Sequence, residues 1–140
     1  MEKKFYFEGW QEYYTKLLPR DTTTIIAHND CQENNILISL KDNLNLMMVD
    51  FEYTGWQPRA MDIANYFNET MLDNAYNYKN GITYYTENIM DKEELADFEQ
   101  TYLKAAGIDV AIEQFHKEVV QCAIFNNFFW GVWPIMMIPE

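Results

Sequence analysis

The stretch IIAHNDCQENNIL, residues 25–37, places a run of polar side chains between two apolar segments. A chain reversal needs only one or two Asn, Asp or Gly residues. Between His28 and Asn35 this stretch instead carries a histidine, two carboxylates and several amides. We therefore expect residues 28–35, called the polar loop below, to hold a functional site as well as a turn.

The apolar segments on either side of the polar loop predict short strands. TTTIIAH, which ends at His28, is short and β-branched and so predicts a strand. After the loop, ILISL and LNLMMVD flank the turn signal KDN, which predicts a hairpin whose second strand ends at Asp50. The expected order is strand, polar loop, hairpin.

Helices are predicted on both sides of these strands. Residues 5–18 and 59–72 repeat apolar side chains at three- and four-residue spacing, which is typical of amphipathic helices. Residues 73–90 are rich in Tyr and Asn and weakly patterned, and we expect a loop there with at most a short helix. Together these elements predict an α+β fold that is mainly helical.

Two further helices are predicted from their end signals. Asp91 opens an Asx-x-x-Glu start signal and Gly107 is a C-cap residue, so a helix is expected over 92–106. Asp109 is expected to cap the last helix. That helix should run to Pro134, where the missing N–H and the ring should end or kink it.

Composition limits the class of protein. The chain has 140 residues, 49% of them hydrophobic, which suits one domain with a core. A formal charge of -12 argues against nucleic acid or an anionic membrane as partner and suits a cationic ligand or a divalent metal. The two cysteines, Cys31 and Cys122, favour a reduced intracellular compartment over a disulfide scaffold. No signal peptide and no membrane span is expected, so we predict a cytoplasmic protein.

The polar loop and the end of the hairpin have the layout of a phosphotransferase centre. Asp30 could accept a hydrogen bond from a substrate hydroxyl and take its proton. Asn35 and Asp50 would offer oxygen ligands to magnesium, which prefers them. His28 would hold Asp30 in place by bonding loop carbonyls. An Asn-rich loop and a strand-terminal cap would explain either motif by itself, but both in this order favour the catalytic interpretation.

Three segments carry a family resemblance: HNDCQENNIL, MMVDFEYTGWQPRAMDIANYFNET and NNFFWGVWPI. Together they resemble the choline/ethanolamine kinase family, whose signature has His-Asn-Asp-x-Gln-x-x-Asn, Asp-Phe-Glu-Tyr, Asp-Ile-x-Asn-x-Phe-x-Glu and Trp-Gly-x-Trp in that order. The similarity covers essentially the whole chain. The block from Asp-Phe-Glu-Tyr to Glu69 separates it from aminoglycoside phosphotransferases and protein kinases.

The resemblance implies a role for each matching residue. It implies Asp30 as the catalytic base, Gln32 beside the transferring phosphate, and Asn35 with Asp50 as magnesium ligands. Further residues are implied in holding the substrate's ammonium end (Glu69, Trp130, Trp133 and, as the nearby tyrosine, Tyr76) or in supporting the site (His28, Asp62 and Arg59). At the position where family members usually place that tyrosine the chain has Asn74, so one side of the ammonium site is unassigned.

The tryptophan pair has two interpretations. Residues three apart on a helix lie on adjoining parts of one face, and by spacing alone such a stripe more often packs in a core. The motif context favours an aromatic cage, because a quaternary ammonium has no N–H to donate and is bound by aromatic faces and a nearby carboxylate.

The resemblance also implies a fold and an activity. The fold would be the large C-terminal lobe of a protein-kinase-like fold, with residues 1–140 a partial domain. We expect the N-terminal nucleotide-binding lobe to be absent, since no glycine-rich loop or strand-borne lysine precedes His28. With Mg²⁺ and ATP, the enzyme would transfer the γ-phosphate to the hydroxyl of choline or ethanolamine, giving phosphocholine for phospholipid biosynthesis.

Alternatives remain open at this point. This chain alone would be an inactive fragment. It could instead be a non-catalytic ammonium-binding or dimerisation module, or an aminoglycoside-type phosphotransferase. An exposed lobe interface would leave an apolar patch that allows a homodimer.

Overall fold

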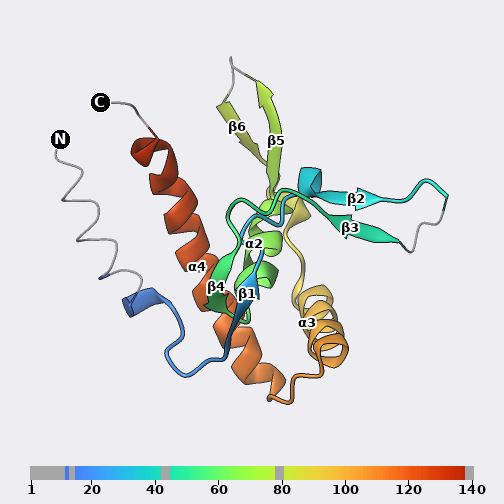
Figure 1. Cartoon of the computed structure of the whole chain (residues 1–140), viewed down its shortest axis with the longest axis vertical. Coiled ribbons are helices and arrows are strands. Elements are labelled where there is room, and N and C mark those ends of the chain that lie inside the picture. The colour runs from blue at the N-terminus through green and yellow to red at the C-terminus, as the bar shows by residue number, and fades with distance from the viewer. Residues whose placement is uncertain (1–11, 13–14, 42–44, 78–80, 138–140) are drawn as a thin grey trace.

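The computed structural model describes residue 12 and residues 15–41, 45–77 and 81–137. Figure 1 shows α2 at the centre of the chain, between α3 and the long α4, with two hairpins projecting from this body. The elements in chain order are β1 (Thr24–Ala27), η1 (Glu33–Asn35), β2 (Ile36–Ile38), β3 (Leu46–Met48), β4 (Gly55–Pro58), α2 (Met61–Glu69), β5 (Leu72–Asn77), β6 (Gly81–Tyr84), η2 (Thr86–Asn88), α3 (Lys92–Ala106) and α4 (Ile112–Met136).

The strands around the polar loop are confirmed. β1 lies within the predicted TTTIIAH segment, and β2 pairs antiparallel with β3 as the predicted hairpin, with Leu37 opposite Met47. The turn signal, residues 42–44, lies outside the described residues. β3 ends at Met48 rather than Asp50, because Asp50 has a left-handed backbone (φ 63°) that a strand cannot contain.

A strand that is not predicted from the sequence completes the frame of the site. β4 pairs antiparallel with β1, and Ala27 lies opposite Gly55. This pairing returns the chain after Asp50 to the start of the polar loop. Two segments separated by the whole hairpin therefore lie side by side.

The prediction of a loop over residues 73–90 is wrong. β5 and β6 form an antiparallel hairpin there, with Leu72 opposite Tyr84, followed by η2. The register shifts between Asp73 and Asn77, and such an irregularity hides the two-residue alternation by which a strand is recognised.

The helix predictions hold with corrected ends. α2 covers the middle of the predicted 59–72 segment, and α3 has the predicted bounds. Of the helix predicted over 5–18, residues 12 and 15–17 are helical, Leu18 lies in a bend just after the helix, and residues 5–11, 13 and 14 lie outside the described residues. Asp91 and Glu94 form a full capping box, and Gly107 ends α3 with φ 65°.

The predicted start of α4 is wrong, and its end lies two residues beyond Pro134. Its N-cap is Ala111, which makes no side-chain cap bond, so Asp109 does not cap this helix. At the other end the helix continues past Pro134 to Met136. The Met137 N–H donates to the Trp133 carbonyl at 3.1 Å, an i to i−4 bond that continues the helical turn past the proline.

The hydrophobic core lies mainly between α2 and α4. Each helix turns one apolar stripe inward, and β1 and α3 contribute single residues. The buried members of this core are Leu18, Ala27, Ala60, Met61, Ile63, Ala64, Leu103, Phe115, Val119, Cys122, Ala123 and Phe125. No helix within the described part of the chain is long and apolar enough to span a membrane. Cys31 and Cys122 are both free and buried.

Candidate active site

Asp30 is the most constrained carboxylate of the polar loop. It is buried, and the Asn35 amide donates to its Oδ2 at 2.8 Å and to its backbone carbonyl at 3.0 Å. The Gln32 amide donates to Oδ2 at 3.1 Å and to Oδ1 at 3.3 Å. Both donors are neutral, and the single long bond to Oδ1 leaves that oxygen able to accept another hydrogen bond.

His28 connects the polar loop to the end of the hairpin. Its Nδ1 accepts the Asp30 backbone N–H at 3.3 Å, so its Nε2 carries the proton and donates to the Val49 carbonyl at 2.8 Å. The Phe51 ring lies 4.9 Å from the imidazole, centroid to centroid. The imidazole thus joins the backbone of Asp30 to the residue that precedes Asp50.

Side chains in the first half of α2 accept hydrogen bonds from the backbone of the polar loop. The Asp62 carboxylate accepts the backbone N–H groups of His28 (2.9 Å) and Asn29 (2.8 Å). One turn later, the buried Asn65 amide oxygen accepts the Cys31 N–H. These bonds satisfy the backbone N–H groups of residues 28, 29 and 31. Buried N–H groups without an acceptor would lower the free energy of unfolding.

Asp50 is placed beside the polar loop by a backbone hydrogen bond of the residue before it. The Val49 N–H donates to the Asn35 carbonyl at 3.0 Å, which places Asp50 next to the end of η1. The Asp50 side chain itself is exposed. Its left-handed φ of 63° turns the chain sharply at this point.

The donor set fits magnesium. Because the Asn35 Nδ2 is committed to Asp30, its oxygen is the atom left to face a cation, and Asp50 supplies a charged oxygen. No group of three His, Cys, Asp or Glu residues in the described chain could form a complete metal site. Magnesium commonly keeps one or two protein oxygens and completes its shell with phosphates and water, so Asn35 and Asp50 would be a sufficient protein share for such a site.

The predicted tryptophan pair lies in a group of four rings, called the aromatic cluster below. The Trp130 ring lies 5.8 Å from Trp133, 5.3 Å from Tyr53 and 5.1 Å from Phe129, the last two edge to face. The buried Trp130 indole N–H has no acceptor among the described residues. A tryptophan that only fills a core usually bonds this group.

Tyr53 is the ring of the aromatic cluster on which the carboxylates of the site act. Burial and the charges of Glu52, Asp30 and Asp50 raise its pKa, while a hydrogen bond with Trp133 acts in the opposite direction. The ring therefore stays neutral, and both Asp30 and Asp50 are near enough to act on it.

Glu69 ends α2 and is half-buried. Its charge reaches the buried Cys31 thiol, whose pKa is raised by burial and by the charges of Asp62, Asp30 and Glu69. The site is therefore a concentration of negative charge around the polar loop, as a cationic ligand requires. Tyr76 lies in β5, and its side chain is not among the described ones.

An open hollow of about 490 Å³ lies between the end of α2 and α3, lined by Thr70, Asn88, Met90, Glu94, Asp97, Phe98 and Thr101. None of the site residues predicted from the sequence lines it. The candidate site is thus defined by the contacts around Asp30 and not by this hollow.

The arrangement of a buried aspartate, two amides and a following aspartate agrees with comparisons to known proteins. Residues 7–139 match the family model for choline/ethanolamine kinase. The chain belongs to this family. The choline/ethanolamine kinase of Homo sapiens is 35% identical over 137 residues, covering 86% of this chain and 34% of the relative. A probable ethanolamine kinase of Nematostella vectensis is 31% identical over 144 residues, covering 96% and 39%.

Solved structures of choline and ethanolamine kinases share this kinase-like fold. The choline kinase from Cryptosporidium parvum Iowa II has a TM-score of 0.72 at 26% identity, covering 94% of this chain and 37% of that one. An ethanolamine kinase of Plasmodium vivax has a TM-score of 0.67 at 26% identity, covering 97% and 34%. The chain spans about a third of the length of these family members.

Within this member of the choline/ethanolamine kinase family, a buried amide network was not predicted from the sequence. The Asn126 oxygen accepts from Asn65 (3.3 Å) and Asn68 (3.2 Å), and Asn68 also donates to the Ala123 carbonyl at 3.0 Å. It joins α4 to α2 beside the polar loop. The available signal was Asn126 itself, a polar residue on the mainly apolar stripe of α4.

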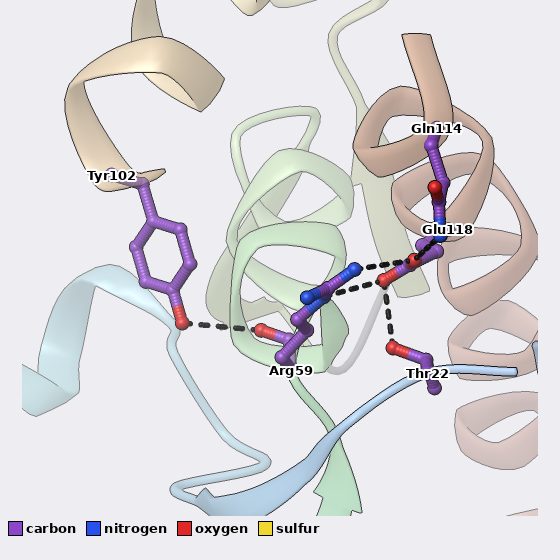
Figure 2. Close-up of polar contacts among 5 residues, drawn as sticks. All are labelled: Thr22, Arg59, Tyr102, Gln114 and Glu118. Atoms are coloured by element: carbon purple, nitrogen blue, oxygen red, sulfur yellow. Dashed lines mark hydrogen bonds and ion pairs between the residues drawn. The ribbon is translucent and has the colours of Figure 1, made fainter. Parts of the chain in front are cut away.

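A buried ion pair lies just before the start of α2. Figure 2 shows the Arg59 guanidinium against the Glu118 carboxylate, with Nε–Oε2 at 2.9 Å and Nη2–Oε1 at 2.8 Å. Thr22 and Gln114 also donate to Glu118, and the Tyr102 hydroxyl donates to the Arg59 carbonyl at 3.1 Å. This geometry suits a structural role for Arg59, because these bonds tie the residue that follows β4 to the segment before β1, to α3 and to α4.

Proposed function

We propose that this chain is the catalytic, acceptor-binding lobe of a kinase that transfers the ATP γ-phosphate to the hydroxyl of choline or ethanolamine. The observation that carries the proposal is the buried Asp30 carboxylate, held by Gln32 and Asn35 and joined through His28 to the segment bearing Asp50. Family membership supports the substrate class. Lobe identity is supported by the similarity to about a third of each solved kinase.

Asp30 is proposed as the general base. Its Oδ1 would accept the hydrogen bond of the substrate hydroxyl, orient the oxygen toward the γ-phosphorus, and take the proton as the O–P bond forms and the bond to the ADP oxygen breaks. The neutral donors on its other oxygen hold the carboxylate without neutralising it. Asn35 and Asp50 would hold magnesium, which neutralises phosphate charge when bound.

The ammonium end of the acceptor is proposed to lie at the aromatic cluster and Glu69. Aromatic faces attract a quaternary ammonium, and the negative charge around Cys31 adds to that attraction. Trp130 and Trp133 would supply the faces, and Tyr53 is a third ring, whose role was not predicted from the sequence. Tyr76 stays a prediction, as does a homodimer.

A non-catalytic ammonium-binding module is the second candidate. It is favoured by one feature of these 140 residues: they contain five glycines, none in a glycine-rich phosphate loop. Phosphoryl transfer depends on positioning the nucleotide, so we expect no turnover by this chain alone. The aspartates and Asn35 would then serve an activity that needs further segments.

The experiment is a coupled ADP-release assay with choline, ethanolamine and an aminoglycoside. It is run on the chain alone and on a chimera in which the chain replaces the matching segment of the human relative. We expect choline- or ethanolamine-dependent ADP release by the chimera and none by the chain alone. Release that depends only on the aminoglycoside, or a folded chimera without activity, would contradict the proposed function.

A further inference from the structure

Asn29 has a conformation and a contact that the proposed catalytic roles leave unexplained. It lies between His28 and Asp30 with a left-handed φ of 69°, which is uncommon outside glycine but tolerated by asparagine. Its backbone N–H donates to Asp62. Its Nδ2 donates to the Tyr53 carbonyl at 2.7 Å and lies 3.5 Å from the Ala27 carbonyl.

The orientation of the Asn29 amide follows from these neighbours. Both nearby atoms are carbonyl oxygens, so only the NH₂ group can face them, and the reversed amide would set three oxygens together. The Asn29 Oδ1 is buried without a partner among the described residues. The contact with Tyr53 is therefore the principal interaction of this side chain.

Tyr53 is the ring through which the aromatic cluster meets the polar loop. It lies edge to face with Trp130 at 5.3 Å, and Trp130 in turn lies 5.8 Å from Trp133. The backbone on the other side of Asn29 carries Asp30. One side chain thus connects the backbone of the proposed base to that of the proposed ammonium site by a single short bond.

We propose that Asn29 is a positioning residue that sets the distance between the base Asp30 and the aromatic cluster, and so selects amino alcohols with a two-carbon spacing. The inference rests on the proposed function. A ligand that uses both ends of the site must match this distance, whereas a ligand that uses only the ammonium end need not. Asn29 touches neither end of the substrate itself.

The test compares three ligands by isothermal titration on the 140-residue chain: choline, its three-carbon homologue trimethyl(3-hydroxypropyl)ammonium, and tetramethylammonium. Asn29→Gly keeps the left-handed backbone and the N–H to Asp62 but removes the bond to Tyr53. We expect choline affinity to fall by up to about tenfold, because the free energy of one neutral hydrogen bond limits what the loss of positioning can cost. Tetramethylammonium affinity should stay unchanged, and the preference for choline over its homologue should narrow about threefold or more.

A second variant and a matched control test whether the effects of Asn29→Gly come from the lost hydrogen bond. Asn29→Asp retains shape and tolerates the same φ but replaces the donor by an acceptor. Its added charge attracts both cations alike, so the ratio of choline to tetramethylammonium affinity is the quantity to compare, and it should fall as in Asn29→Gly. Asn88→Gly, in the exposed η2 outside the site, controls for glycine's flexibility and should leave every ratio unchanged.

The outcomes separate the two proposals. Equal weakening of choline and tetramethylammonium, or unchanged ratios in both Asn29 variants, would overturn the role of Asn29 while leaving the proposed function standing. If the folded wild-type chain binds choline no better than the homologue, the spacing role is also wrong. Failure of the wild-type chain to bind any of the three would overturn the proposed ammonium site and this inference with it.

Discussion

Asp30 depends on its neighbours for both position and charge. His28 accepts its backbone N–H, and Asn35 and Gln32 donate to its carboxylate, so little freedom remains in the side chain. Such pre-organisation contributes most to the rate when the group must accept a proton in one defined geometry. The residue should therefore tolerate even an isosteric change poorly.

Asp30→Asn tests the base. In the active chimera we expect kcat to fall roughly 10²–10⁴-fold, the usual contribution of a general base, with a smaller change in KM for ATP. Steady-state ADP release measures both. Asp109→Asn, at an exposed position outside the site, is the control. Retention of most of the kcat would remove Asp30 from this role.

Trp130→Phe distinguishes an aromatic cage from core packing. Phenylalanine keeps much of the apolar volume but offers a weaker π-face, so the dissociation constant for choline should rise a few-fold to about thirty-fold, as expected for roughly 0.5–2 kcal/mol. Stability should change little, because the lost indole N–H has no partner among the described residues.

Titration calorimetry and thermal midpoints on the 140-residue chain measure both effects. Trp56→Phe is the matched control, since that side chain is 68% exposed in β4. A lower midpoint with unchanged choline affinity would show that Trp130 is a core residue.

Among the helices, α3 is determined mostly by its own ends. Its capping box is formed by residues three apart, and Gly107 supplies the left-handed residue that ends it. α4 differs, because its inward stripe carries Glu118, Asn126 and Trp130 and so joins the ion pair, the amide network and the aromatic cluster. A shift of α4 would therefore disturb the ion pair, the amide network and the aromatic cluster together.

Asp91→Ala tests the local origin of α3. Loss of the side-chain bonds to the N–H groups of Glu93 and Glu94 should lower the free energy of unfolding by about 1 kcal/mol, within roughly 0.5–2. Denaturant unfolding followed by circular dichroism measures the change. Asp97→Ala, exposed in the middle of the same helix, should be neutral or slightly stabilising because alanine favours helix. Equal effects of the two substitutions would argue against the capping box.

Across the whole molecule, the Arg59–Glu118 pair joins segments that lie far apart in the sequence. Arg59→Met should lower the free energy of unfolding by about 3–5 kcal/mol, because it leaves Glu118 buried and unpaired. The double variant Arg59→Met/Glu118→Leu should lose less than the sum of the single changes. Chemical denaturation of all four proteins completes the cycle, and strict additivity would show that the pair is not coupled.

The same pair predicts a pH dependence. Burial alone raises the pKa of the Glu118 carboxyl, but hydrogen bonds from Arg59 and Thr22 and the guanidinium charge lower it overall, below its ordinary 4.5. A folded-state pKa below the unfolded one means that the unfolded chain binds more protons. This stabilisation is therefore complete above 4.5 and is lost as pH falls through the folded pKa.

Thermal midpoints measured from neutral pH down through this range should fall more steeply for the wild type than for the double variant. Since both proteins share all other carboxylates, the difference between the two slopes measures the contribution of Glu118. Parallel curves would contradict the assignment.

The sequence by itself determined the features that depend on near neighbours. The β-branched run before His28, the hairpin after the polar loop and the two ends of α3 were all predicted, because alternation, turn residues and caps act over a few positions. The motifs around Asp30, Asp50 and Trp130 also identified the family correctly, and the family model matches residues 7–139.

Only the tertiary structure decided how these parts meet. The antiparallel pairing of β1 with β4 joins segments that are far apart in the sequence, with Ile25 opposite Gln57 and Ala27 opposite Gly55. The contacts of Asn29 with Tyr53, of Asn65 with Asn126 and of Arg59 with Glu118 likewise join distant residues. Single-sequence patterns do not report such contacts, because periodicity records which face of an element is buried and not which partner covers it. The contact between the Tyr53 and Trp130 rings is thus decided by the fold, although both residues can be read directly from the sequence.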